Sequence, residues 1–213
     1  MRLKDMSAKE RGIRIAMCFL GNLFIGIGVG TFKFAGLGND PFDGMNMALS
    51  DLLRFYYPLL QISVNVVFFI VEIIWGRKLI GLGTAVNALL LGYIVDLSYK
   101  ILDGLLSMPS NIVIQIIVML TGLILTGLGL SLYQTSDLGV APYDALAIIM
   151  DKKIRKLPYQ VCRIICDAGC AAVCFLAGGI VGLGTLASAF GFGPVIGFFN
   201  KHLSTKLTGK KGN

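Results

Sequence analysis

Long uninterrupted apolar runs constrain this chain more than any other feature. Residues 112–132 are almost entirely apolar, and a run of about 20 such residues is what a helix needs to cross a hydrocarbon layer of about 30 Å. The whole chain is 55% hydrophobic and only 15% charged, with a mean hydropathy of +0.78, whereas soluble domains are about a quarter charged. A membrane β-barrel would alternate apolar and polar residues instead. The sequence therefore predicts an all-α polytopic membrane protein.

Six such runs predict six transmembrane helices within one integral membrane domain, residues 1–213. Two shorter helical stretches follow Pro41 and Pro142, and each is too short and too charged to cross the membrane unaided. The six predicted spans are residues 13–34, 59–75, 79–97, 111–133, 158–178 and 182–199.

The positions of the basic residues predict the orientation, because Lys and Arg in short loops stay on the cytoplasmic side. With six spans, the basic N-terminus, Arg77 and Lys78, the cluster 152–156 and the C-terminal tail all fall on one side. We therefore expect a multi-pass protein of the cytoplasmic membrane with both termini in the cytoplasm. The net charge of +7 then reflects topology and contact with the anionic lipid bilayer, so no nucleic-acid partner is expected.

The chain contains an internal duplication. Residues 26–43 read GIGVGTFKFAGLGNDPFD, and residues 127–144 read GLGLSLYQTSDLGVAPYD, 101 positions later. The block GLGT at 81–84 returns at 182–185 with the same offset. Each repeat, 13–100 and 111–201, holds three predicted spans, and an odd number turns the second copy upside down. Inverted repeats with short helices near the midplane are typical of secondary transporters.

The motif L-G-x-x-P-[FY]-D after a glycine-rich first span, with G-L-G-T before the third, resembles the YitT/YczE group of small bacterial integral membrane proteins. The resemblance rests on residues 37–43 (LGNDPFD), residues 138–144 (LGVAPYD) and the two GLGT blocks. It covers nearly the whole chain. The resemblance implies a bacterial multi-pass helical fold, and it supplies no catalytic residues.

The repeated motif predicts an aspartate, Asp43 or Asp144, at the third position of each short helix. There a carboxylate can reach back to free N–H groups and oppose the positive end of the helix dipole, so both residues are candidate caps. In the other interpretation, these two carboxylates and Asp40 line a cavity and bind a cation, a proton or an amine, because ionisable residues inside a membrane usually face a polar path. The residues that break and restart the helices are Gly38, Pro41, Gly139 and Pro142.

Ionisable residues also occur inside the predicted spans. Arg163 and Asp167 are four residues apart on one helix face, where they can pair, and both are candidates for a polar centre. Glu72 lies near the cytoplasmic end of its predicted span, close to Arg77 and Lys78. We therefore do not count it among the candidate site residues. The stripe of four cysteines, 162, 166, 170 and 174, is interpreted as a packing surface in preference to a soft-metal relay, because no His or Met cluster accompanies it. We expect no metal and no cofactor.

Catalysis is the weaker class of function. The stretch at 40–44 (DPFDG) is similar to the aspartate-rich metal site of membrane phosphotransferases, but the required arginine and the two later aspartates are missing. No other catalytic constellation appears in the sequence, so we do not expect an enzyme.

The sequence favours a transporter or channel that moves a small solute or ion across the bacterial cytoplasmic membrane. Two alternatives stay open, namely a non-transporting accessory or regulatory membrane subunit and a lipid-handling membrane protein. The glycine-rich helix faces also permit a homodimer or a partner subunit.

Overall fold

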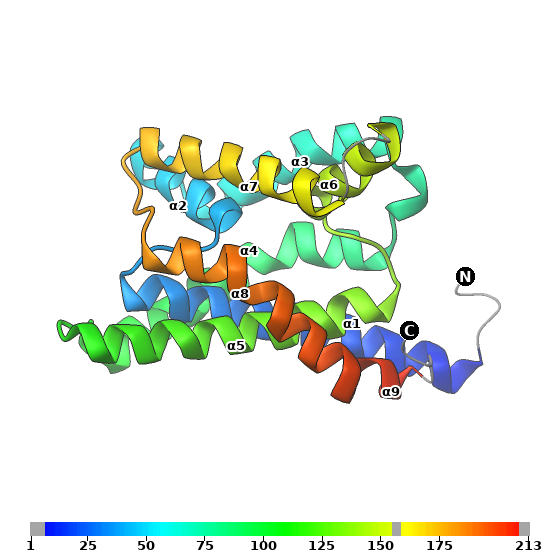
Figure 1. The fold of residues 1–213 in the computed structure, drawn as a ribbon, viewed down its shortest axis with the longest axis horizontal. Helices are drawn as coiled ribbons and strands as arrows, with labels where there is room; N and C mark the ends of the chain where they lie inside the picture. The colour runs from blue at the N-terminus through cyan, green and yellow to red at the C-terminus, as the bar shows by residue number, and fades with distance from the viewer. Residues whose placement is uncertain (1–6, 155–158, 209–213) are drawn as a thin grey trace.

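The chain folds into a helical bundle in which most helices run along the long axis (Figure 1). The computed structural model describes residues 7–154 and 159–208, and these contain helices and no strand. The prediction of an all-α fold is therefore confirmed for the described residues. The long helices are α1 (Ala8–Ala35), α3 (Tyr57–Trp75), α4 (Leu82–Leu105), α5 (Ile112–Ser136), α7 (Tyr159–Leu176) and α8 (Leu183–Phe199).

Five helices of the described chain are long and apolar enough to cross a membrane. They are α1, α3, α4, α5 and a helix that runs from α8 through the π-helical turn η3 (Asn200–Ser204) into α9 (Thr205–Leu207). The remaining predicted span, 158–178, corresponds to α7, and its first residue lies outside the described residues. The membrane class is thus confirmed with five candidate spans, and the sixth stays a prediction.

The two predicted short helices are present as α2 (Pro41–Leu53) and α6 (Pro142–Lys153). A proline opens each of them, at a position where the missing N–H is not needed. Their first three residues are buried, and from the interior the two helices run toward opposite ends of the bundle (Figure 1). The short helix η2 (Arg77–Leu79) links α3 to α4.

Helices α1 and α5 cross at glycines in the middle of the bundle. A Cβ placed on Gly28 would lie 2.8 Å from the carbonyl oxygen of Gly122, and one on Gly129 would lie 2.6 Å from that of Gly21. Only glycine permits so close an approach, which is a common device in membrane helix packing. These glycines are therefore occupied by contacts within the chain.

Candidate functional site

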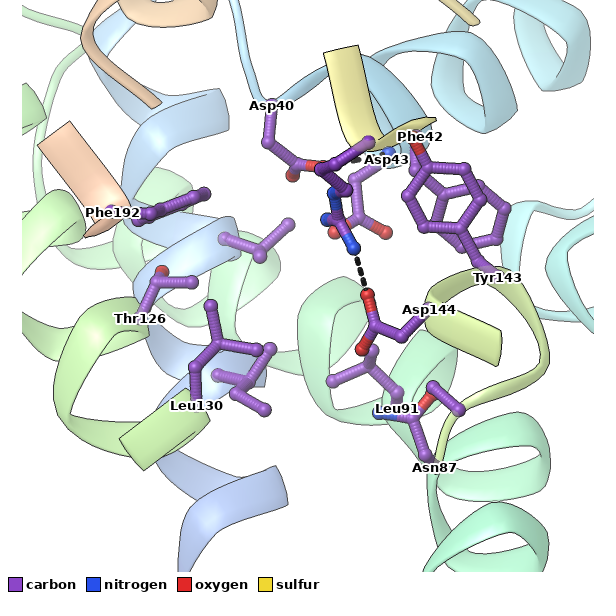
Figure 2. A pocket seen from close by; sticks show the side chains of 14 residues that line it. Asp40, Phe42, Asp43, Asn87, Leu91, Thr126, Leu130, Tyr143, Asp144 and Phe192 are labelled. Carbon is purple, nitrogen blue, oxygen red and sulfur yellow. Dashed lines mark hydrogen bonds and ion pairs between the residues drawn. The ribbon is translucent and has the colours of Figure 1, made fainter. Parts of the chain in front are cut away.

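A small polar cavity lies where the two short helices begin (Figure 2). Its volume of ≈ 50 Å³ suits a few water molecules or one small ion. Helix α2 contributes Phe42 and Asp43, with Asp40 just before it, and α6 contributes Tyr143 and Asp144. The other helices add Arg163 and mostly apolar side chains, such as Leu91, Leu130 and Phe192, and the polar Asn87 and Thr126.

The aromatic residues of the two motifs stack on each other beside the cavity (Figure 2). The ring centroids of Phe42 and Tyr143 lie 4.4 Å apart with an interplanar angle of 13°. Because an aspartate follows each ring in the sequence, the stack holds Asp43 and Asp144 on either side of one small space. The structure thus brings together two residues that are 101 positions apart in the chain.

Asp43 is buried and receives hydrogen bonds from neutral groups of α3. Its Oδ1 accepts from the hydroxyl of Tyr57 at 3.1 Å and from Nε2 of Gln61 at 2.8 Å. The preceding Asp40 caps α2, because its Oδ1 accepts from the N–H of Asp43 at 3.3 Å. The other oxygen of Asp40, Oδ2, is buried without a hydrogen-bond partner among the described residues.

Asp144 instead pairs with a cation. Nη1 of Arg163 on α7 forms an ion pair with Oδ1 of Asp144, and Nε of the same guanidinium lies 3.3 Å from Oδ1 of Asp167. The hydroxyl of Tyr143 donates to Asp167, and the guanidinium carbon of Arg163 lies 4.8 Å from the centre of the Tyr143 ring. Arg163 therefore forms ion pairs with two carboxylates at once, those of Asp144 and Asp167. The pair with Asp167 agrees with the spacing of four residues in the sequence.

Asp43 and Asp144 lie at the third position of α2 and α6, as predicted, but their described side-chain bonds are not capping bonds. In α2 the cap is Asp40, and in α6 the residue before the helix is Ala141, whose side chain makes no cap hydrogen bond. Both aspartate side chains bond to the helix that follows in the chain, α3 for Asp43 and α7 for Asp144. Their part in function stays a prediction.

The loop before each short helix is held by the other half of the chain. The carbonyl of Leu37 accepts from the N–H of Gly184, and that of Leu138 accepts from the N–H of Gly83, each at 2.8 Å. A matching pair of side-chain bonds runs from Thr185 Oγ1 to the Asn39 carbonyl at 2.8 Å and from Thr84 Oγ1 to the Val140 carbonyl at 2.7 Å. The Leu-Gly segment in each half of the chain thus binds the GLGT block of the other half.

The motif glycines are required by this contact. Gly38 and Gly139 have φ values of +94° and +120°, in the region that favours glycine. Across the contact, a Cβ on Gly81 would lie 2.1 Å from the carbonyl oxygen of Leu138, and one on Gly184 would lie 2.2 Å from that of Gly38. These four glycines therefore allow the loops before α2 and α6 to contact the starts of α8 and α4.

Sequence reasoning missed the partners of Asp43. Tyr57 and Gln61 are four residues apart at the start of an apolar run, on one face of α3. That spacing of polar groups in an otherwise apolar helix is the signal that could have identified them.

No group of three or more His, Cys, Asp or Glu side chains in the described part of the chain could hold a metal ion. Cys170 and Cys174 pack with Phe42 and Tyr143 in an apolar cluster, and Sγ of Cys166 lies 3.7 Å from Sδ of Met150. These contacts agree with the interpretation of the cysteines as packing residues.

A family of unknown function, DUF6198, matches residues 12–201. An uncharacterized protein of Haemophilus influenzae is 29% identical over 177 residues, which are 82% of this chain and 78% of that protein. The uncharacterized membrane protein YczE of Bacillus subtilis is 25% identical over 191 residues, 89% of this chain and 86% of the relative. No solved structure matches the chain significantly. The resemblance to the YczE group is therefore confirmed, and the chain belongs to the DUF6198 family.

Proposed function

We propose that the protein moves a small cation, or a small solute with a cationic group, across the bacterial cytoplasmic membrane through the cavity between α2 and α6. One observation carries the proposal: two short helices deliver Asp43 and Asp144 to the same cavity inside a membrane bundle. Buried ionisable residues are costly in a membrane and usually mark a path for ions or substrates.

The charges around the cavity favour a positive cargo. Its described lining includes three carboxylates, of Asp40, Asp43 and Asp144, and one guanidinium, of Arg163. That guanidinium is already shared with Asp167. A helix N-terminus alone would attract an anion, but the surplus of carboxylates opposes one. A cation or an ammonium group would compensate the surplus.

Two larger hollows support access to the cavity from opposite ends. One of ≈ 280 Å³ includes Lys33, Gly38 and Asp51 in its lining, and another of ≈ 380 Å³ includes Asp137 and Gly139. Lys33 and Asp137 lie at the C-terminal ends of α1 and α5, which point in opposite directions (Figure 1). Each hollow contains one motif glycine. We infer that these are the two mouths of an alternating-access path.

The exchanged hydrogen bonds between Leu-Gly loops and GLGT blocks support the proposal that residues 13–100 and 111–201 are inverted repeats. The basic residues support the orientation with both termini in the cytoplasm. Arg11, Arg77, Lys152 and Lys206 belong to the start of α1, η2, the end of α6 and α9, which share one end of the bundle (Figure 1). By the positive-inside rule that end is cytoplasmic.

An apolar groove between α3 and α4 favours lipid handling as a second candidate function. Its volume is ≈ 280 Å³, and its lining includes Ile62, Val66, Phe69 and Leu89. Such a groove suits an acyl chain. In this function the protein would bind long-chain lipids and leave small cations unbound.

The test is a thermal-shift screen of the purified full chain in detergent. The probes are ammonium, choline, amino acids, alkali and divalent cations, inorganic anions and long-chain phospholipids, because a ligand of the folded state raises the melting temperature. We expect a dose-dependent shift with a cationic probe that is lost in Asp43→Asn and in Asp144→Asn. Asp103→Asn, which alters an exposed carboxylate on α4, should keep the shift.

Uptake of the same probe into liposomes that contain the protein then tests movement. Shifts with phospholipids alone would favour the lipid-handling function. A cation shift that persists in both aspartate variants would contradict the assignment of the cavity.

A further inference from the structure

Glu72 is a buried acid that lies outside the cavity. It sits one turn before the end of α3, and its side chain is 0% exposed. Neither carboxyl oxygen has a hydrogen-bond partner among the described residues. Arg77 and Lys78 follow within six residues, yet both are exposed and neither forms an ion pair with Glu72. Nearness in the sequence therefore does not give Glu72 a basic partner.

An ionised carboxylate in this position would cost far more than the neutral acid. A buried charge without a partner loses its hydration and gains nothing in return, so such a group takes up a proton instead. The same holds more strongly inside a membrane. Burial without a partner therefore favours the protonated form of Glu72 in this conformation.

The helix packed against this end of α3 is α6. The hydroxyl of Tyr133 on α5 is also buried and donates to no described acceptor. On α6, Ile149 contacts the last turn of α3, because a Cβ on Gly76 would lie 2.8 Å from its Cδ1. Lys153 turns outward, with its Nζ 3.9 Å from the centre of the Trp75 ring.

Besides α6 and η2, the helices that pack on α3 are α2 and α4, and neither brings a described charge to this end. Helix α2 carries Asp43 at the cavity and Asp51 near its far end. The charged residues of α4 are Asp96, Lys100 and Asp103, more than ten residues beyond the start of that helix.

Three buried polar residues lie along one face of α3 between the cavity and Glu72. Gln61, Asn65 and Glu72 share one buried face, and Gln61 donates to Asp43 at 2.8 Å. Asn65 is 2% exposed, and neither polar atom of its side chain has a described partner. The three residues cover about 16 Å of helix.

A basic hollow lies beside the residues that follow Glu72 at the end of α3. Its volume is ≈ 460 Å³, and its lining includes Arg77, Lys78, Lys152, Gly76 and Ile149. Gly76 directly follows α3, and its N–H donates to the backbone carbonyl of Glu72 at 2.6 Å. When α3 and α6 separate at this end, the hollow would bring water and three basic side chains to the carboxyl group.

We propose that Glu72 is a proton-binding site, loaded in this conformation and emptied into the basic hollow, and that protons thereby drive the movement of the cargo. On release, the carboxylic acid gives its proton to water and becomes a carboxylate among Arg77, Lys78 and Lys152. The driving role rests on the proposed function, whereas proton binding at Glu72 does not.

Infrared spectroscopy of the full-length protein tests proton binding directly. We expect a carbonyl stretch of a protonated carboxylic acid near neutral pH that is absent in Glu72→Gln and present in Asp103→Asn. Melting temperatures give a second readout. The folded protein holds a proton that the unfolded chain has released, so the stability of the wild type falls as the pH rises and that of Glu72→Gln falls less. A band and a pH profile that Glu72→Gln leaves unchanged would overturn the proposal.

Proton entry into liposomes tests the route. The liposomes contain the protein and the dye pyranine, and a potassium gradient with valinomycin sets the voltage. We expect Ile149→Ala, which widens the contact beside Gly76, to raise proton entry several-fold, and Ile149→Val to raise it less. Glu72→Gln should abolish the gain in either background. A gain that survives Glu72→Gln, or no gain from either Ile149 variant, would overturn the route.

The two proposals fail separately. Infrared evidence for a protonated Glu72 together with no uptake of any cationic probe would overturn the transport function alone. Uptake that is indifferent to a pH gradient and to Glu72→Gln would overturn the driving role of protons alone.

Discussion

The two halves of the cavity use the same motif and compensate its charge in different ways. Asp43 accepts hydrogen bonds from the neutral groups of Tyr57 and Gln61, whereas Asp144 pairs with the guanidinium of Arg163. A repeat can therefore copy the backbone geometry of a site while the neighbouring helix changes its charge. Asp144 already has a cationic partner within the protein. A cationic cargo would therefore stabilise Asp43 more than Asp144.

The largest expected loss of stability comes from removing the guanidinium of Arg163, which belongs to the described lining of the cavity. Arg163→Gln leaves Asp144 and Asp167 facing each other without a cation, and breaking a largely buried ion pair costs about 3 kcal/mol. Unfolding of the purified protein in detergent measures this loss. The double variant Arg163→Gln/Asp144→Asn should recover part of the lost stability, because it removes one of the two carboxylates left without a cation. A single variant as stable as the wild type would show that the guanidinium does not hold this half together.

The matching change in the first half should cost less. Gln61→Leu removes the 2.8 Å hydrogen bond to Asp43 and leaves the bond from Tyr57, and a hydrogen bond to a charged group contributes about 2 kcal/mol. The same unfolding measurement compares the two halves. Asp43→Asn is the control, because its amide oxygen still accepts from Gln61. If Gln61→Leu destabilises the protein more than Arg163→Gln, the neutral half is the more tightly held one, contrary to our comparison.

The smallest effects should be equal in the two halves. Thr84→Val and Thr185→Val each remove a hydrogen bond to a loop carbonyl of the opposite half and the bond that the same hydroxyl accepts from a backbone N–H at the start of its own helix, at a net cost of about 1 kcal/mol per variant. The two sites share no partner, so the double variant should show the sum of the losses. Clearly unequal losses would mean that the two loop contacts differ in strength despite their matched geometry.

Local features of the fold could be predicted from the sequence. The length of the apolar runs predicted the long helices. The proline of each motif, with the aspartate two residues later, predicted where α2 and α6 begin. The repeat suggested that Asp43 and Asp144 belong together, and the spacing of Arg163 and Asp167 predicted their pairing. Each of these inferences depends on helix geometry or on a direct comparison of two segments.

The remaining features depend on contacts that sequence spacing does not encode. The bond from Thr185 to Asn39 joins residues 146 positions apart, and the roles of Tyr57 and Gln61 follow from the way α2 folds back onto α3. Nearness to Arg77 and Lys78 in the sequence does not pair Glu72 with either residue, because it does not decide which way a helix face turns. The side chain of Glu72 is buried in the bundle, whereas Arg77 and Lys78 are exposed.

The exchanged loop contacts also have a consequence for biosynthesis. The loop at residues 37–39 takes its hydrogen bonds from Gly184 and Thr185. At a translation rate of 5 to 20 residues per second, the ribosome needs about 7 to 30 s to make the 146 residues that separate Asn39 from Thr185. During that interval the first three long helices are in the membrane with polar backbone groups unsatisfied. The carbonyls of Leu37 and Asn39 therefore lack these donors until α8, the last long helix, has been made.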